Sequence, residues 1–234
     1  MNSKLLLLVL ASFGMVSSAP AQSVLSPIGV TPVSISPFSS FTQFSRAAYC
    51  HHRRLESWNC GAACDALPGF VPAVVGGNGK TVPVYFVGYW PANDTIVVAH
   101  QGTDPTSLLS LLVDGRVKKR SLDPTLFPSV PSSVLVHSGF AKAHARTASS
   151  VLSEVKKVMD VTRTRSVTTV GHSLGGALAA LDAVFLALNL PSGSEVRGVT
   201  YGTPRVGNAA FAELLESIVG IFIYSFFDAP HPTS

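Results

Sequence analysis

The chain has 234 residues, 47% of them hydrophobic and 13% charged, with a formal net charge of +4. This length allows one sizeable hydrophobic core, and no compositional break divides the chain into two domains. The charge is small and no basic run exceeds Lys118–Arg120, which argues against a nucleic-acid partner. The sequence contains no cluster of metal ligands and no phosphate-binding loop, so we predict neither a metal nor any other cofactor.

Residues 1–21 have the three parts of a secretory signal peptide. Lys4 gives a positive start, Leu5–Ala11 is apolar, and Ala19–Ala21 has the small residues of a cleavage site. The apolar stretch is much shorter than the roughly 20 residues that a spanning helix needs. We therefore expect a secreted, extracellular protein without stable membrane insertion. Residues 22–40 are uncharged and rich in Ser and Pro, which predicts an extended arm or propeptide before a domain at 41–234.

Strands and helices alternate along that domain, which predicts a three-layer α/β fold with a mostly parallel central sheet. The β-rich runs Val82–Trp90 and Thr95–His100 flank a turn cluster and are expected to form an antiparallel pair. Asn93 lies in that turn within an Asn-Asp-Thr sequon, so we predict an exposed glycosylation site. The other expected elements are a helix at Phe41–Tyr49, a short apolar helix or turn at Leu108–Val113, a surface loop at Gly115–Ser133, one amphipathic helix at Ala141–Asp160, a strand at Val196–Tyr201, a helix at Asn208–Ile218 and a strand at Ile221–Phe227.

One stretch carries a chemical signature. Ser166–Val170 is an uncharged run rich in β-branched residues, which predicts a buried strand of a parallel sheet. The chain then passes through Gly171-His-Ser173-Leu-Gly175 into an Ala/Leu-rich segment of high helix propensity. A strand, a strained turn and a helix around one serine are typical of a nucleophile elbow, whose turn is expected to lift the Ser173 hydroxyl clear of the sheet. The alternative is an ordinary glycine-rich connection.

A nucleophilic serine also needs hydrogen-bond donors for the oxyanion that its attack creates. The amide of Leu174 is expected at a helix N-terminus, where it can face that oxyanion. The strand that ends at His100 continues into Gly102–Thr103, which could place an amide and a hydroxyl over the same edge. The alternative is a plain turn at a strand end, which the spacing alone favours.

Four linked motifs together resemble the class 3 fungal lipases, most closely the secreted basidiomycete branch. They are Ile96–Thr103, Val136–Phe140, Val170–Ala177 and Tyr201–Ala212, in the family's order and approximate spacing. The resemblance implies an α/β-hydrolase fold and hydrolysis of carboxylic esters, chiefly acylglycerols at a lipid–water interface, with feruloyl-type esterases as the alternative. It also implies Ser173 as nucleophile, an oxyanion hole of Thr103 and Leu174, a structural role for His137, and a packing role for His172.

The chain departs from the family after Val219. Asp228 follows a strand-like run 55 residues after Ser173 (228 − 173), where the triad acid is expected. His231 is the only histidine after the serine, and its flanking prolines make it a poor candidate for the base. We therefore expect a C-terminally incomplete lipase domain. The competing hypothesis to a serine ester hydrolase is a non-catalytic lipid-binding protein or an inactive fragment.

The chain has three cysteines, an odd number for a secreted protein. Cys60 and Cys64 are close enough in sequence for a local disulfide, which we predict, and Cys50 is left over. The family resemblance implies that Cys50 pairs with a cysteine near the C-terminus, and this sequence has none there.

Overall fold

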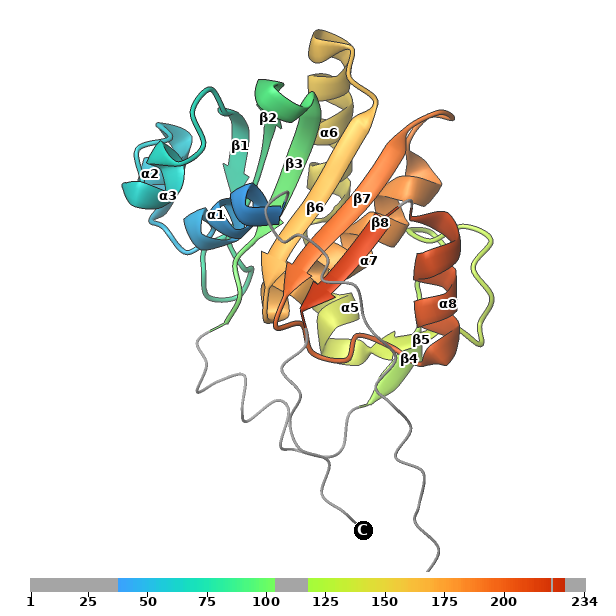
Figure 1. The fold of residues 1–234 in the computed structure, drawn as a ribbon. Helices are drawn as coiled ribbons and strands as arrows, with labels where there is room; N and C mark the ends of the chain where they lie inside the picture. The colour runs from blue at the N-terminus through green and yellow to red at the C-terminus, as the bar shows by residue number, and fades with distance from the viewer. Residues whose placement is uncertain (1–37, 104–117, 220, 226–234) are drawn as a thin grey trace, which may run out of the picture. The chain divides into compact units, whose positions relative to one another are not determined.

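The computed structural model describes residues 38–103, 118–219 and 221–225, and its centre is a six-stranded sheet (Figure 1). The strand order is β1-β2-β3-β6-β7-β8. The strands β1, β2 and β3 pair antiparallel, and β3, β6, β7 and β8 pair parallel. Their bounds are β1 (Val71–Gly76), β2 (Tyr85–Trp90), β3 (Thr95–His100), β6 (Ser166–His172), β7 (Glu195–Tyr201) and β8 (Ile221–Ser225). The prediction of a mostly parallel sheet is confirmed.

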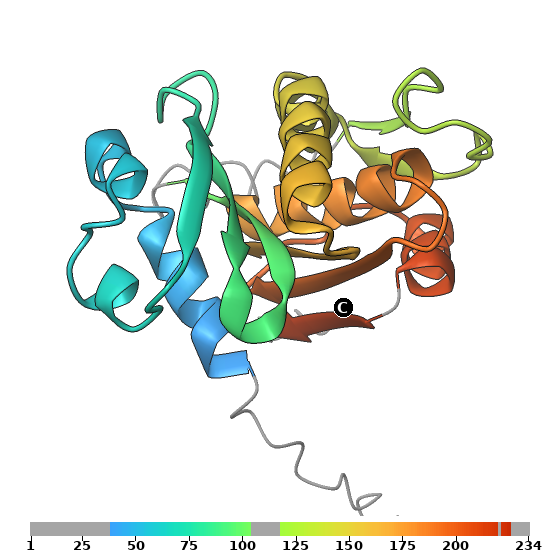
Figure 2. The same ribbon diagram turned by 90° about the horizontal axis from the view of Figure 1, so that it is seen from above.

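Helices pack on both faces of this sheet, as Figure 2 shows for α1 on one side and α6 and α7 on the other. Within β3 the side chains alternate: Ile96 and Val98 join the core under α6 and α7, whereas Val97 and Ala99 join the core under α1. A central parallel strand is buried on both faces, which explains its unbroken apolar sequence. The helices are α1 (Ser39–Ala47), α2 (His52–Glu56), α3 (Ala62–Asp65), α5 (Ser138–Ala145), α6 (Ala148–Thr162), α7 (Leu174–Asn189) and α8 (Ala209–Ile218). The predicted three-layer architecture is therefore correct.

The register brings the carboxyl ends of the central strands to one edge. His100 at the end of β3 pairs with Gly171, and His172 at the end of β6 pairs with Tyr201 at the end of β7. In open α/β sheets ligands bind at this edge, outside the carboxyl ends of the strands. The fold thus places the predicted serine turn, which follows β6, at the functional edge.

A cluster of aromatic rings fills the core under α1. Phe44 is fully buried at its centre, and the ring centroid of Phe70 lies 5.0 Å away and that of Trp90 5.3 Å away, both in edge-to-face geometry. Such pairs add to the free energy of burial because ring edges and faces carry opposite partial charges. The helix starts at Ser39, two residues before the predicted start at Phe41, so the end of the predicted arm belongs to the fold.

Two predictions about the middle of the chain are wrong. The segment predicted as one helix at Ala141–Asp160 is two helices, α5 and α6, separated at Arg146–Thr147. The apolar stripe on which that prediction rested begins at Ala148, the first residue of α6. Thr147 closes the turn by donating both its amide and its hydroxyl to the carbonyl of His144.

The predicted loop at Gly115–Ser133 contains a short strand, β4 (Lys119–Ser121), which pairs antiparallel with β5 (Leu135–His137). The proline-rich part lies between these two strands, as its composition suggested. The structure also contains β1, α2 and α3, which were not predicted. None of the helices in the described ranges is long and apolar enough to span a membrane, and the predicted helix or turn at Leu108–Val113 lies outside them.

The predicted antiparallel pair of β2 and β3 is confirmed. A 3₁₀ turn at Pro91–Asn93 connects the strands, and Asp94 after it adopts the left-handed conformation. The hydroxyl of Tyr89 donates to the carboxylate of Asp94 over 2.8 Å, which holds the turn closed. The side chain of Asn93 is exposed at this tip, as a glycosylation site requires.

Candidate active site

Ser173 occupies a strained turn between β6 and α7. Its φ of 60° and ψ of −126° lie in a region that non-glycine residues rarely adopt. Two backbone hydrogen bonds hold it there: its amide donates to the carbonyl of Tyr201 over 2.9 Å, and its own carbonyl accepts from Ala177 over 3.2 Å. The helix begins at Leu174, so the first helical amides, which have no acceptor within the helix, lie directly after the serine.

Three glycines allow four segments to converge on this turn. A Cβ on Gly171 would lie 2.6 Å from the amide nitrogen of Gly176, and a Cβ on Gly175 would lie 2.9 Å from the carbonyl carbon of Gln101. A Cβ on Gly176 would collide with the hydroxyl of Thr203, after β7. Real Cβ atoms do not approach so closely, so each position requires glycine for space.

The Ser173 side chain does not stand clear of the sheet, contrary to expectation. It is only 2% exposed, and its Oγ has no hydrogen-bond partner within the described residues. A buried hydroxyl without a partner costs free energy, and such groups in native structures are characteristic of functional sites.

The end of β3 lies directly beside the serine turn. A Cβ on Gly102 would lie 2.6 Å from the carbonyl oxygen of His172, so the strand end touches the residue before the serine. Thr103, the predicted second oxyanion residue, comes next and is half-buried. The predicted donors Thr103 and Leu174 thus belong to the two segments that meet at Ser173. The predicted acid, Asp228, and His231 lie outside the described residues.

Tyr49, which the sequence analysis did not select, contacts both the end of β3 and the serine turn. Its hydroxyl lies 2.8 Å from Nδ1 of His172 and against the backbone of Gly102. Burial raises the pKa of Tyr49, and the hydrogen bond from the Gly102 backbone partly opposes this rise. Burial lowers the pKa of His172, so near neutral pH the imidazole is neutral and the phenol is protonated. His172 is therefore held by Tyr49, in agreement with its predicted packing role.

The predicted structural role of His137 is also clear. Its Nδ1 accepts from the amide of Gly139 over 3.0 Å and from that of Phe140 over 3.4 Å, which caps the N-terminus of α5. The imidazole ring stacks on Phe140 with centroids 4.2 Å apart. Burial lowers the pKa of His137, which keeps Nδ1 free to accept.

A second polar group lies wholly buried beside the elbow. Oδ2 of Asp182 is 2.5 Å from Nε2 of His100, and its Oδ1 is 2.9 Å from Nε2 of His144. Burial by itself raises the pKa of the Asp182 carboxyl, but the two imidazoles outweigh burial and hold the pKa well below its usual range. Asp182 lies within α7 and not at the end of a strand, where a triad acid is expected. The available signal was that it is the only charged residue in the sixteen residues of α7.

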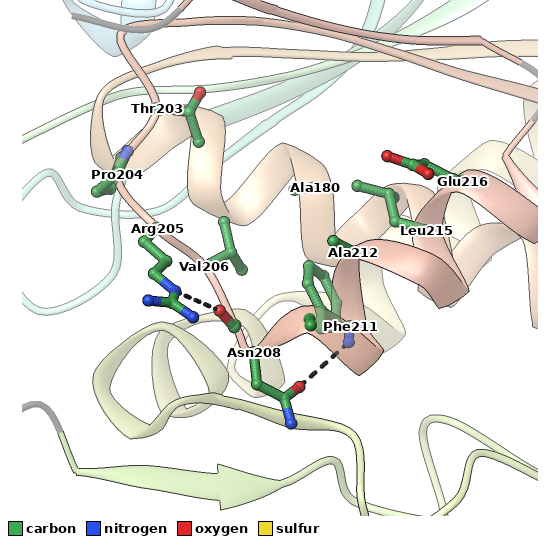
Figure 3. A pocket seen from close by; sticks show the side chains of 12 residues that line it. Ala180, Thr203, Pro204, Arg205, Val206, Asn208, Phe211, Ala212, Leu215 and Glu216 are labelled. Carbon is green, nitrogen blue, oxygen red and sulfur yellow. Dashed lines mark hydrogen bonds between the residues drawn. The ribbon is translucent and has the colours of Figure 1, made fainter. Parts of the chain in front are cut away.

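A cavity of about 460 Å³ opens next to the elbow helix, between α7, the segment after β7 and α8 (Figure 3). Val206, Phe211 and Leu215 line its apolar wall. Asn208 caps the N-terminus of α8: its side-chain oxygen accepts a hydrogen bond from the amide of Phe211 over 3.1 Å. The volume lies in the range of small-molecule sites. Ala180 is the residue of α7 that lines the cavity, and Thr203, which also lines it, lies close to Gly176 in the first turn of that helix.

The three cysteines lie between the end of α1 and α3. Cys60 and Cys64 form the predicted disulfide, with Cα atoms 5.3 Å apart. Cys50 is a free thiol 3.7 Å from the carbonyl oxygen of Cys60, and burial raises its pKa.

The model of the family Lipase (class 3) matches residues 97–229, more than half of the chain. This chain belongs to the class 3 lipase family. The match begins in β3 and includes the strained serine turn and the segment after β7 that lines the cavity. Figure 1 shows these parts in green, yellow and orange.

This class 3 lipase is similar to named relatives over about half of its length. It is 33% identical over 125 residues to a secreted mono- and diacylglycerol lipase of Malassezia globosa, covering 53% of this chain and 41% of the relative. It is 35% identical over 127 residues to another of Malassezia restricta, with the same coverage. The aligned region thus spans less than half of these relatives.

Solved structures share the fold. The lipase of Rhizomucor miehei in complex with its propeptide is 26% identical with a TM-score of 0.68, covering 81% of this chain and 60% of that one. Lipase II from Rhizopus niveus is 25% identical with a TM-score of 0.70, covering 81% of this chain and 70% of that one. The α/β-hydrolase fold implied by the sequence motifs is therefore confirmed.

Proposed function

We propose that this class 3 lipase is a secreted serine ester hydrolase that acts on acylglycerols at a lipid–water interface. The observation that carries the proposal is the strained Ser173, held between the end of β6 and the first turn of α7 with the end of β3 beside it. A costly backbone conformation of this kind persists where the surrounding structure enforces it, and such positions cluster at active sites.

In the proposed mechanism, Ser173 Oγ attacks the ester carbonyl while a general base takes its proton, and a tetrahedral intermediate forms. The Leu174 amide and Thr103 donate to its oxyanion, and the positive end of the α7 dipole adds to that stabilisation. The carbonyl then re-forms and expels the alcohol, which takes the proton from the protonated base and leaves an acyl group on Ser173. Water gives a proton to the same base and attacks this acyl-enzyme, which releases the carboxylic acid and returns the proton to Ser173 Oγ. Asp228 is proposed as the acid that orients the base.

The substrate class is supported by two observations. Both Malassezia relatives are called secreted mono- and diacylglycerol lipases, which favours acylglycerols over feruloyl esters and supports secretion of this chain. The cavity beside the elbow helix has an apolar wall of Val206, Phe211 and Leu215, which suits an acyl chain. Secretion is also what glycosylation at Asn93 requires, and a mobility shift after glycosidase treatment tests this modification.

A second candidate function is lipid binding without turnover. It is favoured by the state of the histidines near the elbow: His172 is bonded to Tyr49, and His100 and His144 are bonded to Asp182. Within the described part of the chain none of these three is hydrogen-bonded to Ser173 Oγ, which has no partner there, and the Nδ1 atoms of His100 and His144 are buried without a partner.

A fluorophosphonate probe separates the two candidates because it labels only an activated serine. We expect the wild type to be labelled and to release fatty acid from emulsified monoacylglycerol, and Ser173→Ala to lose both properties. Ser217→Ala is the matched control, since this exposed hydroxyl only donates to the carbonyl of Leu214 on α8. An unlabelled but folded wild type that still binds lipid would establish the non-catalytic alternative.

A further inference from the structure

The buried Asp182 is unusual for its surroundings. It is the only charged residue of α7, a helix whose residues from Gly175 to Leu186 are all buried. The carboxylate and its two imidazole partners are enclosed by aromatic rings: the centroid of Tyr85 is 5.9 Å from His100, and those of Phe127 and Phe185 are each 5.3 Å from His144. Burying such a group is costly, and replacing it by apolar side chains often does not lower stability. Its benefit must therefore lie in something other than stability.

The contacts of His100 indicate what that benefit is. Its backbone carbonyl touches the first turn of α7 at Gly175, where a Cβ would collide with it. Its side chain bonds to Asp182, seven residues further along the same helix. His100 is thus fixed to α7 at two points. It is also the last residue of β3, and the next residues are Gln101, Gly102 and Thr103.

The rest of α7 offers no comparable directional contact to β3. Apart from Asp182 its only polar side chain is Asn189, which donates to the carbonyls of Leu126 and Phe185 at the other end of the helix. The remaining side chains are Ala, Leu, Val and Phe, whose packing is not directional and tolerates small shifts along the helix axis. His144 on α5 bonds the second carboxylate oxygen, so Asp182 cannot turn away from His100 without breaking that bond.

We infer that Asp182 is a positioning residue for the oxyanion hole. Through His100 it fixes the end of β3, with Gly102 and Thr103, relative to the start of α7, with Ser173 and Leu174. This inference rests on the proposed function, because the two positioned segments carry the proposed donors. Oxyanion donors act only when held within roughly 0.5 Å of the productive geometry, so a shift of α7 along β3 would lower the rate of acyl transfer.

The test compares Asp182→Asn with Asn189→Ala in the full chain. Asparagine keeps the shape of Asp182 but can accept from only one histidine through its single carbonyl oxygen, and its amide group then faces the other Nε2. Asn189→Ala is the matched control, because it removes the other polar side chain of the same helix at a distance from β3. The substrate is a soluble p-nitrophenyl ester, and the rate is expressed per serine titrated with the fluorophosphonate probe.

We expect Asp182→Asn to lower kcat by about 10- to 100-fold with KM within about twofold, because the loss concerns the transition state. Asn189→Ala should lower stability but leave kcat per titrated serine unchanged. His100→Gln should resemble Asp182→Asn, and the double variant should be no slower than either single variant, since both act through one bond. A purely structural role would instead lower the titratable fraction and leave kcat per titrated serine at the wild-type value, and this result would overturn the inference.

Amide hydrogen exchange separates this inference from the proposed function. Asp182→Asn should speed exchange in peptides that cover residues 96–103 and 171–178, whereas Asn189→Ala should not. Unchanged exchange in these peptides overturns the inference, whatever the activity. If the wild type is not labelled at Ser173, the proposed function fails and the catalytic consequence of Asp182 fails with it, while the exchange data still decide whether Asp182 holds the two segments together.

Discussion

Replacing Gly175 by alanine tests the claim that the end of β3 is held against the elbow. The new Cβ would lie 2.9 Å from the carbonyl carbon of Gln101 and closer still to the carbonyl oxygen of His100. Ordinary contacts begin at 3.4 Å, so the strand end must retreat by at least 0.5 Å (3.4 − 2.9). The atoms in the way are backbone atoms of a central strand, and no side-chain rotation can relieve the collision. We expect a loss of about 2–3 kcal/mol in the free energy of unfolding, typical of overpacking in a core.

The same displacement should slow catalysis, because it moves Gly102 and Thr103 away from Ser173 by about the tolerance of an active site. We expect kcat per titrated serine to fall by about 10- to 100-fold. The assay is p-nitrophenyl ester hydrolysis alongside urea unfolding of the same preparations. Gly193→Ala is the control: its φ of 82° makes alanine unfavourable by about 1–2 kcal/mol, but no atom lies within 4 Å of the new Cβ. A folded Gly175→Ala protein with wild-type kcat would refute the claim that the end of β3 must be held against the serine turn.

Two further predictions concern stability. Phe44→Ala should lower the free energy of unfolding by about 3–5 kcal/mol, because it empties the centre of the aromatic cluster. Val161→Ala, at a residue that is 83% exposed, should change the free energy of unfolding by less than about 0.5 kcal/mol. Urea unfolding of both variants measures the contrast, and equal effects would contradict the packing argument. Burial lowers the pKa of His172 below 6.5, so the folded protein binds fewer protons than the unfolded chain. The contribution of His172 to the free energy of unfolding should be complete above about pH 6.5 and should decline as the pH falls below it. His172→Gln should flatten this decline in the urea midpoints measured between pH 8 and 5. An unchanged dependence of the midpoint on pH would show that other groups cause the decline.

Local patterns of fewer than twenty-five residues led to correct predictions. The strand, serine turn and helix around Ser173 lie within Ser166–Asn189, and the β2–β3 hairpin depends on the turn residues Pro91–Asp94. Each pattern follows from neighbours along the chain, because steric limits on φ and ψ and the periodicity of side chains act over that range. The disulfide between Cys60 and Cys64 is similarly local.

The failures have a common cause in contacts between distant parts of the chain. The break between α5 and α6 has no proline or glycine to mark it, and it accompanies the bond of His144 to Asp182, 38 residues away. The close approach at Gly171, Gly175 and Gly176 likewise brings together segments that follow three different strands. An apolar stripe in the sequence shows which face of a helix is buried, but it does not show which segment of the chain packs against that face.

The sequence by itself determined the strands and helices around the local motifs, the family, and the serine on which the proposed chemistry depends. Tertiary structure alone decided that Asp182 meets His100, 82 residues earlier, and that Tyr49 meets His172, 123 residues later. The physical reason is that a buried polar group must find its hydrogen-bond partner wherever the packed core brings one within about 3 Å, and separation along the chain carries no information about that distance.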